Sequence, residues 1–173
     1  MHTLLGYSEI NTMITYEDLQ NAAEEASEKK FSHAEILRKC VGNFIEYYHQ
    51  SLAIAANPTF CNHKGEEMQI ITLGVSEHNV FKEKYLHELK LSDDFTLSFM
   101  LKTVIAMKGV HHTWIASPIT ISMNSDVVTF TFNDNSETKS CRIPQGNTLA
   151  IYSEAADMLK MITMNIIKQT APK

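Results

Sequence analysis

The segment from Ile119 to Lys168 constrains the fold most strongly, because it joins three strand-like runs to one long helix-like run. In each of the first three runs apolar and polar residues alternate, a period of two that is typical of half-buried strands. Clusters of Asn, Asp and Ser separate the runs, and these residues favour tight turns. The pattern predicts a three-stranded antiparallel meander over about 119–143 with one face in water. Its strands are 119–123, 127–132 and 138–143.

A long apolar helix is predicted to follow the meander and to cover it. Over 149–168 the apolar residues recur at the i, i+4, i+7 spacing of one helix face. Met161 and Met164 widen this apolar stripe beyond what one sheet face needs. One interpretation buries the whole stripe among neighbouring elements. The other lets Met161 and Met164 bind another chain, since flexible thioether side chains adapt to varied partners, and predicts a homodimer formed through this helix.

The N-terminal third of the chain predicts a helical pair over 15–56. Two capping-box patterns mark the helix starts, Thr15 with Asp18 and Ser32 with Glu35. Each pattern places a hydroxyl residue three positions before an acidic one, so that the two side chains can satisfy the free N–H groups of the first turn.

The middle of the chain gives weaker patterns. Residues 95–108 fit two structures, because their apolar residues alternate as in a strand, while acidic residues before them and a glycine after them resemble helix ends. We favour the helix. The other predicted elements are a surface loop over 59–67, a strand over 68–73 that ends at Gly74, a helix over 78–90, and a strand over 110–116 that is interrupted at Ser117-Pro118.

The predicted fold class is α+β: an N-terminal helical segment, and a mainly antiparallel sheet covered by a long C-terminal helix. A chain of 173 residues fits one domain. We expect that single domain to span 1–173, with a lead-in over 1–14 and with the sheet and its covering helices over 68–168.

Net charge and cysteine usage bear on location and partners. A net charge of −5 argues against a general nucleic-acid binder, which needs a basic surface, and favours a basic partner protein. The three cysteines, Cys40, Cys61 and Cys141, are odd in number and lack motif spacing, which suits a reducing compartment. The N-terminus lacks the pattern of a signal peptide, and no apolar run approaches the ~18 residues of a membrane span. We therefore expect a cytoplasmic protein without membrane contact.

Cysteine and histidine pairs are the candidates for chemistry. His111 and His112 are adjacent, but neighbouring strand residues point to opposite faces, and zinc sites use a different ligand spacing. Cys61 and His63 are two positions apart on a predicted loop and could form the Cys–His pair of a hydrolase. Neither pair carries a family motif. We expect no metal and no cofactor.

Trp114 is the candidate centre of a binding surface. Tryptophan is enriched at interface hot spots, and this one is close in sequence to His111 and His112. A place in the core of its strand is an equally good interpretation. Together with Met161 and Met164, these three residues are the predicted binding residues.

The sequence therefore predicts a small acidic binding or regulatory protein that acts through protein–protein contacts, as an inhibitor, an immunity-type protein or an adaptor. Its support is the negative charge, the wide apolar helix and the absence of a catalytic motif. The alternative is an enzyme whose site is assembled from scattered residues, because many active sites have no local signature.

Overall fold

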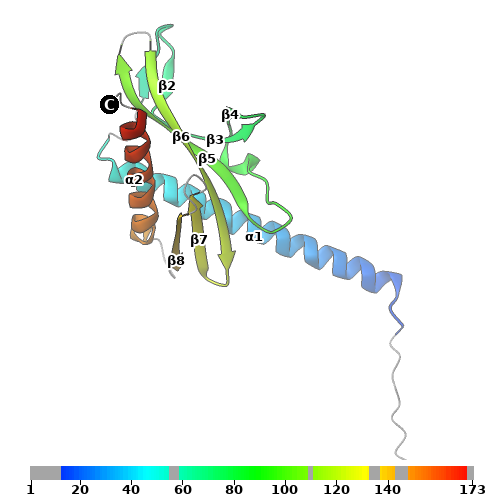
Figure 1. Ribbon diagram of the computed structural model, residues 1–173. Coiled ribbons are helices and arrows are strands. Elements are labelled where there is room, and N and C mark those ends of the chain that lie inside the picture. The colour runs from blue at the N-terminus through cyan, green and yellow to red at the C-terminus, as the bar shows by residue number, and fades with distance from the viewer. Residues whose placement is uncertain (1–12, 55–58, 109–110, 133–136, 143–147, 171–173) are drawn as a thin grey trace, which may run out of the picture. The chain divides into compact units, whose positions relative to one another are not determined.

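The structure is a computed structural model with the described elements drawn in Figure 1. The residues that it describes are 13–54, 59–108, 111–132, 137–142 and 148–170, and the side chains of 106–108, 111–112, 137 and 140–142 lie outside that description. The chain divides into two units, Met1–Ser32 and His33–Lys173. The helices are α1 (Tyr16–Ser51), the 3-10 helices η1 (Leu86–Glu88) and η2 (Leu149–Tyr152), and α2 (Ser153–Thr170). The strands are β1 (Thr59–Cys61), β2 (Glu67–Gln69), β3 (Ile71–Glu77), β4 (Val80–Glu83), β5 (Leu97–Lys108), β6 (His111–Asn124), β7 (Val127–Phe132) and β8 (Glu137–Arg142).

Within the described residues, six strands form one antiparallel sheet in the order β4-β3-β5-β6-β7-β8. Its last three strands confirm the predicted meander, and the α+β fold class is confirmed with it. Two-residue turns join β3 to β4 at His78-Asn79 and β6 to β7 at Ser125-Asp126. His78, Asn79 and Ser125 have positive φ angles, as such tight hairpin turns require. The strands β1 and β2 form a separate two-stranded hairpin.

The predicted helix over 95–108 is wrong, because this segment is the twelve-residue strand β5. Burial along this segment alternates as in a strand: Leu97, Phe99 and Leu101 are all buried, and only a strand puts three residues spaced by two on one face. The acidic stretch before this segment, which resembled a helix start, is part of a loop. The Ser92 hydroxyl accepts a hydrogen bond from the Thr96 amide at 3.0 Å and so closes the loop before the strand.

Two further predictions for the middle of the chain are wrong. The segment 78–90 is not a helix but contains β4 and the short helix η1, since the left-handed His78-Asn79 turn folds the chain back beside β3. The strand β6 is not interrupted at Ser117-Pro118. Pro118 keeps its place in the strand, where it pairs with Met100 of β5.

The strand predicted over 68–73 is also corrected. Its first residues belong to the hairpin strand β2, while β3 begins at Ile71 and continues through Gly74 to Glu77. The predicted surface loop over 59–67 carries β1 and the start of β2 at its two ends.

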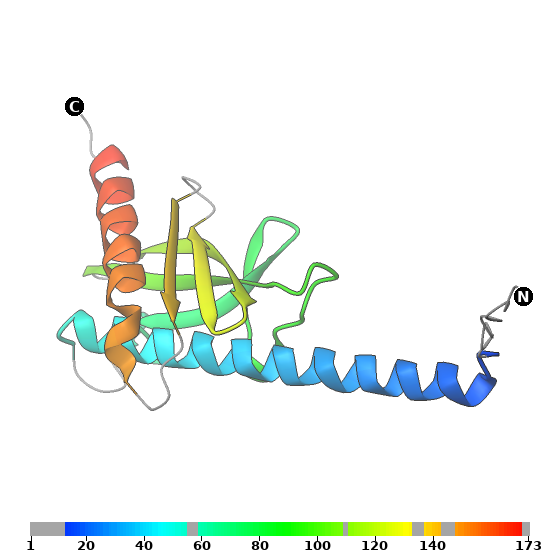
Figure 2. The ribbon, with the colours of Figure 1, turned by 90° about the horizontal axis from the view of Figure 1, so that it is seen from below.

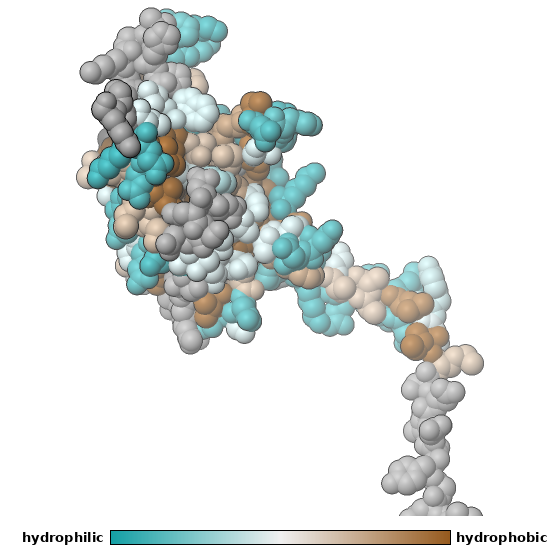
Figure 3. Space-filling model, viewed as in Figure 1, coloured by the Kyte–Doolittle hydropathy of each residue, from teal (hydrophilic) through white to brown (hydrophobic). Residues whose placement is uncertain are grey.

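The N-terminal unit contains the first turns of α1. The predicted capping box at Thr15 is present: the Thr15 amide donates to Asp18 Oδ2 at 2.8 Å, and the Asp18 amide donates to Thr15 Oγ1 at 3.2 Å. Hydrogen bonds from the Thr15 hydroxyl and amide lower the pKa of the Asp18 carboxyl. Every described residue of this unit, 13–32, is exposed, and Figure 3 shows apolar and polar residues side by side along it.

The predicted helical pair is a single helix. Ser32 is an interior residue of α1, so the second capping-box pattern does not begin a new helix. Good helix formers such as Glu, Lys, Ala, Leu and Arg prevail on both sides of Ser32, which explains why a local cap signal is overridden.

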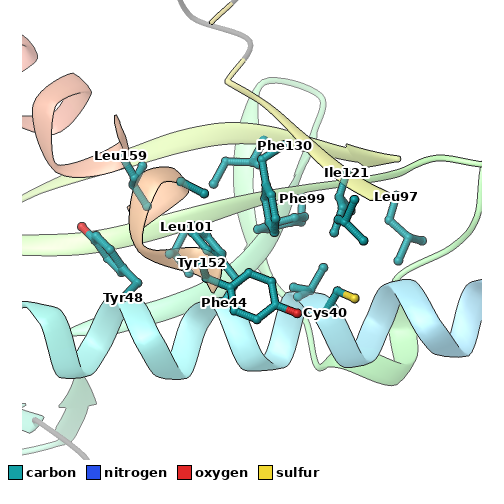
Figure 4. Packing of buried hydrophobic residues seen from close by; sticks show 14 of the residues in the cluster. Cys40, Phe44, Tyr48, Leu97, Phe99, Leu101, Ile121, Phe130, Tyr152 and Leu159 are labelled. Atoms are coloured by element: carbon teal, nitrogen blue, oxygen red, sulfur yellow. The ribbon is translucent and has the colours of Figure 1, made fainter. Parts of the chain in front are cut away.

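The core of the second unit lies between one face of the sheet, the second half of α1, and α2. Phe44 contacts the Phe130 ring at a centroid distance of 4.7 Å and also lies near Tyr48 and Tyr152. Figure 4 shows Cys40, Phe44 and Tyr48 pointing from α1 toward the strands, and Figure 2 shows α2 running across this part of α1. The other large, fully buried members include Leu37, Val41, Leu97, Leu101, Ile119, Ile121, Phe132 and Leu159.

Polar contacts inside this core join its layers. The Tyr48 hydroxyl lies 3.3 Å from Thr103 Oγ1 on β5, and it also hydrogen-bonds Thr163 on α2. The Cys40 thiol hydrogen-bonds Tyr152. Burial raises the pKa of both Tyr48 and Cys40. Because the folded state favours the neutral form of both groups, their full contribution to stability is present at neutral pH. It is lost as the pH rises above the pKa values of these groups in the unfolded chain.

Candidate functional site

Trp114 lies on the outer face of the sheet, opposite the core. In β6 the residues Ile119 and Ile121 are fully buried, so alternation points the even-numbered positions, including Trp114, to the other side. The Trp114 side chain is 46% exposed. The interpretation that buried Trp114 in the core is therefore wrong, and the surface interpretation has the geometry it needs.

The side chains of Phe81 and Lys102 lie beside Trp114. We call these three residues together the Lys102 platform. The Lys102 Nζ lies 4.9 Å from the centroid of the Phe81 ring and 5.7 Å from that of the Trp114 ring. The two ring centroids are 6.4 Å apart. Both lysine distances are in the range of cation–π attraction, so the ammonium attracts two aromatic rings from different strands.

Strand register explains how these residues meet. Lys102 lies between Leu101 and Thr103 on β5, and both of these neighbours are buried, so Lys102 points outward. Trp114 pairs directly with Val104 and is therefore the diagonal neighbour of Lys102, which is within reach of long side chains.

Gly74 leaves the room that Phe81 occupies. A Cβ atom at Gly74 would lie 2.5 Å from Phe81 Cζ and 2.4 Å from the Lys82 carbonyl oxygen. Both distances are shorter than atomic contact allows. The absence of a side chain at Gly74 therefore lets the Phe81 ring pack down on β3, next to Lys102.

The charge on the platform is positive although the chain is acidic. Among the described residues Lys102 takes part in no ion pair with a carboxylate. Its recorded contacts are the two rings. An ammonium carries three hydrogen-bond donors, and two ring faces leave it able to bind an anion.

Sequence reasoning named Trp114 but missed Lys102 and Phe81. The signal for Lys102 was present, because a strand over 95–108 places it between inward residues. The helix prediction hid that signal. Phe81 required the β3–β4 hairpin to be recognised, and the pair His78-Asn79 was the available clue.

The other predicted binding residues do not join the platform. Met161 and Met164 are 59% and 51% exposed on α2, which packs on the inner face of the sheet, so the sheet separates them from Trp114. His111 and His112 are the first residues of β6, and their side chains lie outside the described part of the structure.

Cys61 and His63 lie at the β1–β2 hairpin, and both are exposed. The hydrogen bonds of this turn are made by Asn62, whose Oδ1 accepts from the Lys64 and Glu66 amides at 2.9 Å. The structure records no hydrogen bond between the Cys61 and His63 side chains, and the described residues contain no group of three metal-binding side chains. The hydrolase alternative therefore rests on sequence proximity.

Thiol labelling is expected to separate Cys61 from Cys40. Cys61 is exposed and should react with iodoacetamide faster than Cys40, because Cys40 is buried and burial raises the pKa of its thiol, so less thiolate is available. Peptide mapping by mass spectrometry measures both rates. Equal rates at neutral pH would contradict the described packing of Cys40.

No helix in the described ranges combines the length and the apolar composition needed to span a membrane. Comparison with known proteins gives no matching family model, no matching curated protein and no matching solved structure.

Proposed function

We propose that this protein is a non-catalytic binding protein that acts through protein–protein contacts, and that the Lys102 platform is its contact surface. One observation carries the proposal: Trp114, the only tryptophan of the chain, is nearly half exposed on an outer sheet face, and two neighbouring side chains contact it. Exposed tryptophans are typical hot spots, and contacts with neighbours reduce the conformational entropy that such a side chain loses on binding.

The proposed partner is a protein with a basic surface, met in the cytoplasm. The net charge of −5 would attract such a partner at long range and increase the association rate, and added salt would reduce this increase. The proposal includes neither general nucleic-acid binding nor membrane binding.

A pull-down from native cell extract tests the proposal. The native chain, Trp114→Ala and Tyr85→Ala are tagged and compared at low and moderate salt by quantitative mass spectrometry. Tyr85 is the matched control, because its aromatic side chain is 69% exposed and stacks on His87 rather than on the platform. We expect Trp114→Ala to reduce capture of a stoichiometric partner at least tenfold, and Tyr85→Ala to retain it. Full capture by folded Trp114→Ala would contradict the proposal.

A homodimer through α2 is a second proposal, supported by the exposure of Met161 and Met164. Ile162, on the same helix, is buried, so the surface available to a second copy is the methionine face. Light scattering of the native chain should show a mass that rises toward a dimer with concentration. The double variant Met161→Lys, Met164→Lys should remain a monomer, while Met13→Lys, at an exposed methionine of the other unit, should behave as native. A native mass that is monomeric at every concentration would exclude the dimer.

A further inference from the structure

We infer that the group which a partner places on the Lys102 platform is a single carboxylate beside an apolar side chain, as in an aspartate or glutamate within an apolar peptide segment. This inference rests on the proposed function and adds the chemistry of the contact. It concerns the platform residues Phe81 on β4, Lys102 on β5 and Trp114 on β6, which lie together on one face of the sheet.

The polar groups of the platform are donors only. The Lys102 ammonium offers three N–H groups and the Trp114 indole offers one, and neither side chain has an acceptor atom. Among the described residues, neither group is recorded with a hydrogen bond or an ion pair to an acceptor, and the recorded contacts of Lys102 are ring faces. A ligand group that accepts several hydrogen bonds and carries negative charge fits such a set, and a carboxylate does both.

The position of Lys102 strengthens this preference. Its side chain is half-buried on the sheet, and a cation that is partly removed from water gains more from a counter-charge than a fully exposed one. The two aromatic rings beside it add an apolar surface of fixed shape. An apolar side chain next to the carboxylate would cover the exposed part of Trp114.

The number of cations on the platform selects the class of anion. One lysine matches one carboxylate, whereas a nucleic-acid backbone carries a charge at every nucleotide and needs a row of basic residues. A basic side chain would be repelled by Lys102. The overall charge of −5 acts on a partner at long range, and the Lys102 charge acts at contact. A partner that is basic overall and presents one carboxylate is attracted by both.

Intrinsic fluorescence provides a direct test, because Trp114 is the only tryptophan in the chain. The full-length protein is titrated with acetyl-Leu-Glu-Leu-amide, acetyl-Leu-Gln-Leu-amide, acetyl-Leu-Lys-Leu-amide and a decamer of deoxythymidylate, with tryptophan selectively excited. The variants are Lys102→Met, which removes the charge, Lys102→Arg, which keeps it, and Lys160→Met. Lys160 is the matched control, because it is also half-buried but pairs with Asp157 on α2, on the other side of the sheet.

We expect the native protein to bind the Glu peptide at least fivefold more tightly than the Gln peptide, and to bind the Lys peptide least. Lys102→Met should abolish the difference between Glu and Gln, while Lys102→Arg and Lys160→Met should keep it. Equal dissociation constants for the Glu and Gln peptides, binding of neither, or tighter binding of the oligonucleotide would each overturn the inference. If Trp114→Ala loses its partner in the pull-down while the Glu and Gln peptides bind alike, the proposed function stands and the carboxylate is wrong. If Trp114→Ala keeps its partner, the proposed function fails.

Discussion

Phe44→Ala is expected to lower the free energy of unfolding by about 3–5 kcal/mol, the range observed when a buried aromatic ring is deleted. Phe44 is fully buried on α1 and contacts the rings of Phe130, Tyr48 and Tyr152. Phe130 lies on β7, Tyr48 on α1 and Tyr152 on η2. Because three separate elements hold these rings, they cannot all move into the space of the lost ring. The loss therefore combines lost burial with a residual cavity. Urea unfolding followed by far-ultraviolet circular dichroism measures it.

Phe31→Ala is the matched control for this prediction. It removes the same side chain from the same helix, but Phe31 is 67% exposed. Its effect on the free energy of unfolding should stay within about 0.5 kcal/mol, as for surface substitutions in general. A similar loss in both variants would mean that Phe44 does not occupy the centre of the core.

Gly74→Ala is expected to have the second-largest effect, a loss of about 1–3 kcal/mol, as for other overpacked sites. The new methyl group would meet both Phe81 Cζ and the Lys82 carbonyl oxygen at less than 3 Å. A side chain can turn away, but a backbone carbonyl in a strand cannot move without disturbing the pairing of β3 with β4. The Phe81 ring must also leave its place over β3, so Lys102 loses one of its two ring contacts.

Gly42→Ala is the control that separates this steric effect from a general cost of replacing glycine. A Cβ atom at Gly42 would lie 3.1 Å from Leu86 Cδ1, the end of a flexible side chain that can shift. Gly42 is inside α1, where alanine is favoured over glycine by about 1 kcal/mol. We expect Gly42→Ala to be neutral or stabilising in urea unfolding. A stable Gly74→Ala protein with native Trp114 fluorescence would contradict the described packing of Phe81.

The elements that the sequence predicts correctly are those whose pattern has one interpretation. The alternation over 127–132 contains β-branched and aromatic residues that suit a strand alone, and it becomes β7. The segment 149–168 has the apolar spacing of a helix and is longer than ordinary strands, and it becomes η2 and α2. In both cases the local preference and the burial in the fold agree.

The elements that fail are those where two signals compete. Over 95–108 the apolar alternation favoured a strand and the flanking residues favoured a helix, and the pairing of β5 with both β3 and β6 decided the outcome. Such pairing depends on distant residues, which no local window contains. The second capping-box pattern, at Ser32, failed for a related reason, because a good cap does not stop a helix that both flanks continue.

The candidate site could be predicted only in part. Trp114 drew attention as a single residue, but the platform is a product of strand register: Lys102 and Trp114 meet diagonally across β5 and β6, and Phe81 arrives through a hairpin. A change of register by one residue would turn each side chain to the other face. Individual candidate residues can therefore be named from the sequence, whereas their proximity in the folded protein cannot.

The central position of α1 has a consequence for the protein during its synthesis on the ribosome. The apolar stripe that includes Leu37, Phe44 and Tyr48 is made before the partners that bury it, which lie on β5, β6 and β7 and on α2. Until the residues up to about Phe132 have left the exit tunnel, this stripe has no sheet to cover it. The stripe therefore stays exposed on the nascent chain until the sheet has been made, and it is a natural target of a chaperone that holds exposed apolar surface.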